Sequence, residues 1–151
     1  MPTALVTGVA GFIGSNLADA LLDRGYAVRG VDNFETGRKQ NLEPLQNADN
    51  FSFHETDIRD ADAMAEITED VDYVFHQAAV PSVPRSVEDP ITTTDANCTG
   101  TATVLNAARN ADVDTAVVAS SSSVYGSTEQ LPKVESMTEQ PESPYALSKY
   151  Y

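Results

Sequence analysis

The 151-residue sequence lacks several features that define other classes of protein. Cys98 is the sole cysteine, so no internal disulfide can form, and together with the missing signal peptide this predicts a cytoplasmic location. No apolar run approaches the about 18 residues that a membrane-spanning helix needs, so no membrane span is expected. His54 and His76 are isolated, and no cluster of metal ligands is expected.

Basic residues are also scarce. The sequence has 9 basic and 23 acidic residues, which gives a net charge of −14. This balance argues against nucleic acids and anionic membranes as partners. The acidic residues are scattered, which is typical of a solvated surface. A halophilic source, in which such a surface keeps the protein soluble in concentrated salt, is a sharper hypothesis. Equal stability in low and molar salt would contradict it.

Short apolar runs alternate with helical patterns along the chain, which is 41% hydrophobic and is expected to form one domain. The expected strands are residues 3–7, 27–31, 51–54, 71–76 and 115–119. The expected helices are residues 12–24, 60–68 with Asp60 as N-cap, 97–110, and a last helix that begins near residue 144. The apolar face of the first helix consists of Phe12, Ile13, Leu17 and Leu21. Prolines predict irregular loops over residues 81–90 and 126–144.

Strands that alternate with helices predict an α/β fold, a doubly wound Rossmann-type parallel sheet with helices on both faces. A glycine-rich first turn favours the strand order 3-2-1-4-5. That architecture normally continues to a sixth strand, so residues 1–151 are expected to be an incomplete domain that is truncated after the fifth strand and the start of the next helix. The fifth strand is therefore expected to be an exposed edge.

The first turn carries glycines at Gly8, Gly11 and Gly14, between a strand and a helix. Glycines let the backbone approach a pyrophosphate, and a helix N-terminus offers free N–H groups and partial positive charge. The spacing is G-x-x-G-x-x-G rather than G-x-G-x-x-G. A tight turn without a ligand is the alternative.

Two acidic residues follow later strands. Asp32 ends the second strand, 18 residues after Gly14, where a carboxylate can accept both ribose hydroxyls and would repel a 2′-phosphate. This favours NAD over NADP, and a turn aspartate is the alternative. Asp57 follows the third strand near an expected adenine site, or it caps a helix. His76 ends the fourth strand and is expected to be a hydrogen-bonded structural histidine.

A tyrosine and a lysine lie four residues apart near the end of the sequence. Tyr145 and Lys149 are expected one helical turn apart on one face. A lysine cation favours the phenolate of a nearby tyrosine, the form that acts as a general base. The serines of residues 120–123 follow the fifth strand, where a hydroxyl either binds a substrate oxygen or satisfies its own loop.

Together these motifs resemble the extended short-chain dehydrogenase/reductase superfamily, in its nucleotide-sugar epimerase/dehydratase branch. The matching stretches are residues 7–14, 32–37, 57–60, 76–79, 97–101, 120–126 and 143–149. The resemblance implies catalytic roles for Ser121, Tyr145 and Lys149. It implies that NAD is bound by Gly8, Gly11, Phe12, Ile13, Gly14, Asp32, Asn33, Asp57, Ile58, Ala78, Ala79, Asn97, Tyr145 and Lys149.

One local difference bears on the reaction. The 4,6-dehydratases of this family carry Asp-Glu directly after the catalytic Ser/Thr, where this chain has Ser122 and Ser123. Residues 83–90 and 131–135 look most like UDP-sugar 4-epimerases. The resemblance therefore implies epimerisation at C4 of a UDP-hexose or UDP-N-acetylhexosamine through a 4-keto sugar, with another reaction of the same branch (dehydratase, decarboxylase or reductase) as the alternative.

The family normally continues with a substrate-binding domain that is absent from these residues. Three hypotheses follow from this expectation: the cofactor half of an epimerase, an inactive NAD-binding module, or a domain that survives through an oligomer. The helix after Tyr145 often forms the dimer interface in relatives, which makes a homodimer an expectation.

Overall fold

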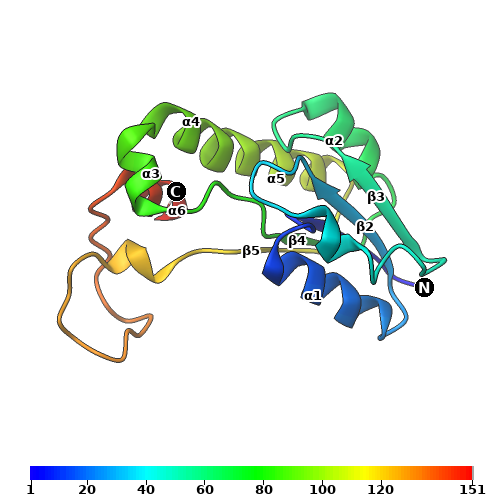
Figure 1. The fold of residues 1–151 in the computed structure, drawn as a ribbon, viewed down its shortest axis with the longest axis horizontal. Coiled ribbons are helices and arrows are strands. Elements are labelled where there is room, and N and C mark those ends of the chain that lie inside the picture. The colour runs from blue at the N-terminus through cyan, green and yellow to red at the C-terminus, as the bar shows by residue number, and fades with distance from the viewer. Residues whose placement is uncertain (151) are drawn as a thin grey trace.

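The computed structural model describes residues 1–150, in which five parallel strands form one sheet in the order β3-β2-β1-β4-β5 (Figure 1). The strands are β1 (Thr3–Thr7), β2 (Ala27–Asp32), β3 (Phe51–Glu55), β4 (Tyr73–His76) and β5 (Thr115–Val118). Every expected strand is present within two residues of its predicted bounds, and the predicted doubly wound order is confirmed.

Helices cover both faces of the sheet. They are α1 (Phe12–Leu22), α2 (Ala61–Thr68), α3 (Val83–Glu88), α4 (Pro90–Thr94), α5 (Gly100–Asn110) and α6 (Pro144–Tyr150). A π-helical turn, η2 (Asp95–Thr99), joins α4 to α5, and 3-10 turns span η1 (Lys39–Leu42) and η3 (Ser122–Tyr125). One core packs α2 and α5 on the sheet through Leu5, Met64 and Val104. The other packs α1 on the opposite face through Val6 and Ala18.

The predicted apolar face of the first helix is wrong at its start. Phe12 is 81% exposed and Ile13 is 64% exposed. The buried residues of α1 are Gly14, Ser15, Ala18 and Leu21. The glycine turn presses the backbone of Gly14 against that of Gly8, so the packed face is rotated away from the first two side chains. The helix also ends at Leu22 rather than at residue 24.

The predicted irregular loop over residues 81–90 is also wrong, because it contains α3 and the start of α4. Pro84 and Pro90 each lie in the first turn of a helix, where proline replaces an N–H that has no helical partner. Ser82 and Asp89 cap these helices through their side chains. Asp60 caps α2 as predicted, through a bond of 3.1 Å from Ala63 N–H to its Oδ1.

Within residues 1–150, strand β5 pairs only with β4 and is exposed along its length, which confirms the expected edge. Val117 is 47% exposed and Val118 is 42% exposed. Among residues 1–150, no helix has the length and apolar character needed to cross a membrane.

Candidate functional site

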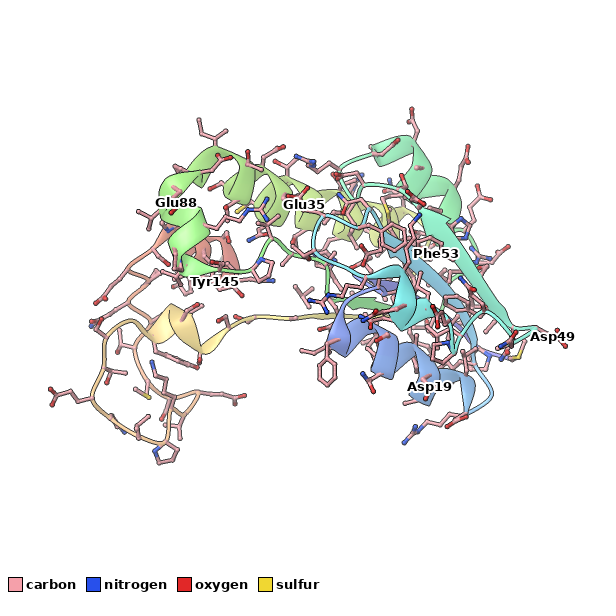
Figure 2. The ribbon with its side chains drawn as sticks, viewed as in Figure 1. Asp19, Glu35, Asp49, Phe53, Glu88 and Tyr145 are labelled. Carbon is pink, nitrogen blue, oxygen red and sulfur yellow. The ribbon has the colours of Figure 1, made fainter. Side chains whose placement is uncertain are left out.

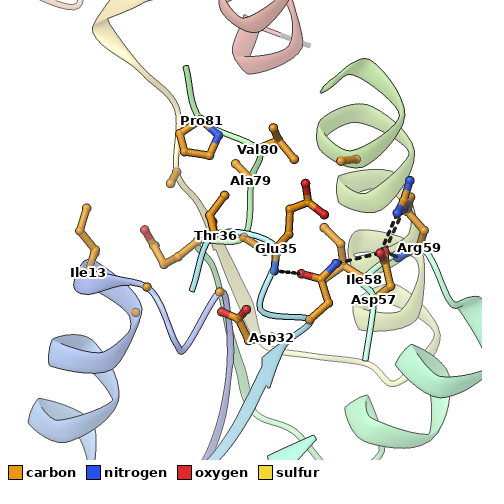
Figure 3. A pocket seen from close by; sticks show the side chains of 18 of the residues that line it. Ile13, Asp32, Glu35, Thr36, Asp57, Ile58, Arg59, Ala79, Val80 and Pro81 are labelled. Carbon is orange, nitrogen blue, oxygen red and sulfur yellow. Dashed lines mark hydrogen bonds and ion pairs between the residues drawn. The ribbon is translucent and has the colours of Figure 1, made fainter. Parts of the chain in front are cut away.

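A cavity of about 520 Å³ lies at the carboxyl ends of the strands (Figure 3). Segments that follow all five strands line it, together with α4, η2 and α6. The predicted site residues that line it are Gly8, Gly11, Phe12, Ile13, Gly14, Asp32, Asn33, Asp57, Ile58, Ala78, Ala79, Tyr145 and Lys149. Ser121 and Asn97 are the predicted residues outside its lining.

The glycine turn is shaped by backbone contacts that exclude side chains. Gly8 has φ of +70°, and a Cβ there would lie 2.7 Å from the backbone nitrogen of Ala78. A Cβ on Gly14 would lie 2.1 Å from the carbonyl oxygen of Gly8. Helix α1 begins directly after Gly11 with no side-chain cap among the described residues, so the N–H groups of its first turn are available at the cavity.

Asp32 is 8% exposed and holds two loops in place with one carboxylate. Its Oδ2 accepts a 2.9 Å hydrogen bond from Ala10 N–H, and its Oδ1 accepts a 2.8 Å bond from Phe34 N–H. A Cβ on Gly37 would lie 2.8 Å from Oδ1, so this glycine lets the loop close over the carboxylate. Asp32 is therefore a turn aspartate, as the alternative predicted, and its carboxylate also lines the cavity.

A chain of polar side chains forms the wall beyond β3 (Figure 3). Asn33 donates a 3.0 Å bond to Asp57, and Arg59 bridges Asp57 and Asp95 with ion pairs of 2.7 Å each. The hydrogen bonds from Arg59 lower the pKa of Asp57 to about 2. The capping role falls to Asp60, so Asp57 is free to build this wall with Ile58, which is buried against Gly100.

Tyr145 and Lys149 lie one turn apart on α6, as predicted, and both reach the cavity. Figure 2 shows Tyr145 below α3, at the opposite side of the molecule from Phe53 on β3. Ser143 Oγ accepts from Ala146 N–H at 3.0 Å and starts the helix. Lys149 Nζ donates to the carbonyl of Ala119 at 2.9 Å, and burial lowers the pKa of the lysine.

Ser121 and Asn97 have structural contacts instead of a place in the cavity lining. Ser121 Oγ accepts bonds from the backbone N–H of Ser123 at 3.2 Å and from its hydroxyl at 2.8 Å, so it caps η3. Asn97 is 2% exposed. Its Oδ1 accepts a 2.8 Å bond from Val80 N–H. Its Nδ2 donates a 3.3 Å bond to the carbonyl of Val80 and a 2.9 Å bond to Ser148 Oγ on α6.

His76 is the structural histidine that the sequence predicts. Its Nδ1 lies 2.7 Å from Thr7 Oγ1 and its Nε2 lies 2.9 Å from Thr101 Oγ1. Burial, with a smaller contribution from the charge of Lys149, lowers the pKa of His76 to about 4. The neutral ring on β4 thus connects the end of β1 to the first turn of α5.

Glu35, Thr36 and Arg59 also line the cavity, and the sequence did not single them out. Glu35 and Thr36 lie within a stretch that the family resemblance already covers, so the signal was present but carried no assigned role. Arg59 also lies in a matching stretch, residues 57–60, without an assigned role, and its bond to Asp95, 36 residues away, is one that no local pattern reveals.

The family model described as "GDP-mannose 4,6 dehydratase" matches residues 5–151 of this sequence. The chain belongs to this family. Among curated relatives, the UDP-glucose 4-epimerase of Mycolicibacterium smegmatis is 46% identical over 149 residues, which are 96% of this chain and 47% of that protein. The chain thus spans about half the length of the curated relatives it matches. The predicted membership of the nucleotide-sugar branch of the short-chain dehydrogenase/reductase superfamily is confirmed.

Solved structures of other family members have the same fold. The UDP-N-acetylglucosamine 4-epimerase of Methanobrevibacter ruminantium, in complex with UDP-N-acetylmuramic acid, has a TM-score of 0.92 and 38% identity over 99% of this chain and 47% of its own. A dTDP-glucose 4,6-dehydratase of Streptomyces venezuelae with NAD bound has a TM-score of 0.92 and 37% identity, over 98% of this chain and 48% of its own. The UDP-glucose 4-epimerase of Bifidobacterium longum with NAD⁺ and UDP has a TM-score of 0.90 and 32% identity, over 98% of this chain and 46% of its own.

Proposed function

We propose that this chain is the NAD-binding part of a UDP-sugar 4-epimerase. One observation carries the proposal: a single cavity joins the glycine turn, Asp32 and the Tyr145/Lys149 pair. The relatives named as UDP-glucose 4-epimerases and the neighbours with bound NAD support it.

The residues present fit NAD. The glycine turn has no room for a Cβ at Gly14, and it exposes the first turn of α1 to the cavity, which suits a diphosphate. The Asp32 carboxylate keeps lone pairs that can accept ribose hydroxyls, and its negative charge disfavours a 2′-phosphate. Ile58 supplies an apolar wall for adenine, and Ala78 and Ala79 keep the groove shallow beside the glycine turn.

The protein's part in the reaction is proton transfer and orientation. Bound NAD would supply the reversible hydride transfer at C4 of the sugar. Tyr145, as phenolate, takes the proton of the 4-hydroxyl and later gives it back. Lys149 is held by the carbonyl of Ala119 and supplies the positive charge that favours the phenolate. Ser121 would need to exchange its bonds with Ser123 for one to the sugar oxygen.

Elimination, the additional step of a dehydratase, needs a carboxylate that this region does not supply. The two residues after Ser121 are Ser122 and Ser123, within η3. Their hydroxyls are poor acids and bases near neutral pH, which favours epimerisation over dehydration among the reactions of this branch.

Incubation with UDP-glucose or UDP-N-acetylglucosamine, followed by separation of the 4-epimers, tests the proposal. An enzyme that contains this chain is expected to form the 4-epimer and retain NAD. NAD is expected to raise the melting temperature of the 151-residue chain alone, whether or not that chain turns substrate over. A folded chain that NAD does not stabilise would contradict the proposal.

The proposal includes a homodimer through α6. Leu147 is 58% exposed and Tyr150 is 55% exposed on this helix, although both are large apolar side chains. Sedimentation of the wild-type chain and of Leu147→Glu tests it. A monomer in the wild type, or a dimer that the glutamate leaves intact, would contradict an interface at α6.

A further inference from the structure

An ion pair joins Glu35, in the lining of the cavity, to Arg85, outside that lining. Glu35 lines the cavity in the loop after β2, and Arg85 lies on α3, which follows β4. The sheet order places β1 between β2 and β4, so the strands that lead to the two partners flank β1, at whose carboxyl end the glycine turn begins. Figure 3 shows the Glu35 side chain extending from its loop toward the segment that carries Ala79 and Val80.

Both ends of the pair are held by local hydrogen bonds. Glu35 N–H donates a 3.0 Å bond to Asn33 Oδ1, within a turn that Asp32 also anchors. Arg85 N–H donates a 3.3 Å bond to Ser82 Oγ at the start of α3. The two side chains therefore project from ordered backbone, and their meeting needs only side-chain rotation.

The charges at this place suit a diphosphate beneath the pair. Glu35 alone would repel a diphosphate at the glycine turn, and the guanidinium of Arg85 offsets that charge. Glu88 and Asp89 are the other charged residues on or beside α3, and within residues 1–150 neither forms a hydrogen bond or ion pair with the Arg85 side chain. The side chains of Arg85 and Glu35 are 42% and 43% exposed, so the pair is weak enough to open.

We propose that the Glu35–Arg85 pair is a strap that closes over the bound dinucleotide and slows its exchange. The inference rests on the proposed function, because it needs NAD in the cavity. Arg85 acts as a positioning residue: it holds Glu35 across the diphosphate, and the dinucleotide leaves when the pair opens.

The rate of NADH release tests the strap. It is measured by stopped-flow fluorescence while excess NAD displaces NADH from the chain. Glu35→Gln and Arg85→Gln are each expected to speed release about two- to fivefold, the range of a partly exposed ion pair. The double variant is expected to release NADH no faster than the faster single variant, because either change alone opens the strap. Glu88→Gln is the control: it removes one negative charge, as Glu35→Gln does, but from α3, and it is expected to leave the release rate unchanged (Figure 2).

Salt supplies a second readout. Raising KCl from about 0.05 M to about 1 M is expected to speed release from the wild type and to have a smaller effect on Glu35→Gln, since salt screens an exposed pair. Single variants with wild-type release rates, or rates that multiply in the double variant, would overturn the strap while leaving NAD binding intact. Failure of NADH to bind the folded wild type would overturn the proposed function itself.

Discussion

The two sides of the cavity differ in how completely the chain builds them. On the cofactor side, the glycine turn, Asp32 and the Asp57–Arg59 wall are tied by backbone packing and short hydrogen bonds. On the catalytic side, Tyr145 and Lys149 lie on a seven-residue helix that packs against α3, α4 and η3. The helix follows a long irregular segment between η3 and α6.

This difference indicates which function each side can perform by itself. A preorganised site binds its ligand without first ordering its own loops, so the cofactor side is expected to bind NAD. The catalytic side is anchored through a few long-range bonds, chiefly Asn97 to Ser148 and Lys149 to Ala119. Proton transfer by Tyr145 depends on how well those bonds hold α6.

Removing the Tyr145 hydroxyl separates the two sides most strongly. In an enzyme that contains this chain, Tyr145→Phe is expected to reduce turnover about 10²- to 10⁴-fold, the range for loss of a general acid–base group. The dissociation constant of NAD is expected to change little, because the phenyl ring still fills its place. Retained turnover would show that another group moves the proton.

A methyl group in the glycine turn tests how rigid the cofactor side is. Gly14→Ala is expected to destabilise the fold by about 3 kcal/mol and to abolish NAD binding, because the clash is with backbone that cannot rotate away. Gly25→Ala is the matched control: Gly25 has φ of +79° but no atom within 4 Å of an added Cβ.

The control is expected to lose only about 1–2 kcal/mol from its left-handed backbone and to bind NAD normally. Urea unfolding and NAD titration of both variants provide the comparison. Equal losses in the two variants would show that the Gly14 contact is not rigid.

His76 joins the two sides, and its titration tests that connection. Its pKa is 6.5 in the unfolded chain and about 4 in the folded one, so the unfolded state binds more protons between these values. Stability is therefore expected to fall by up to about 3 kcal/mol as the pH drops from about 6.5 to about 4.

Urea unfolding of the wild type and of His76→Gln at several pH values measures this slope. The variant is expected to lose the part that His76 contributes, while His54, whose pKa is also lowered by burial, keeps its own part. The contribution of Asp57, whose folded pKa is about 2, appears only below about pH 3.8. A wild-type slope that persists undiminished in His76→Gln would assign it to other groups.

A smaller effect is expected on cofactor choice. Asp32→Ala is expected to weaken NAD about tenfold and to reduce discrimination against NADP, since it removes a charged acceptor worth about 1.5 kcal/mol. Parallel calorimetric titrations with both dinucleotides measure it. Unchanged preference would leave Asp32 with its loop-anchoring role alone.

Much of the fold and the cofactor side follows from local sequence. The glycine turn, Asp32 after its strand and the Tyr145/Lys149 spacing each depend on residues that are neighbours in the chain. Alternating strand and helix patterns then restrict the topology, because parallel crossovers are right-handed.

The features that the sequence missed depend on contacts between distant segments or on how a turn packs. Phe12 and Ile13 fit a helical face by spacing, yet the Gly8–Gly14 contact rotates them outward. Pro84 and Pro90 suggested a loop, although capping residues place them in helix first turns. The Arg59–Asp95 pair joins segments that only the folded sheet brings together.

The most direct measurement is a calorimetric titration of NAD into the folded wild-type chain, with folding checked by circular dichroism. The proposed function predicts saturable binding at one site, a raised melting temperature and weaker binding of NADP. A folded chain that shows neither binding heat nor a shift in melting temperature with NAD would contradict it.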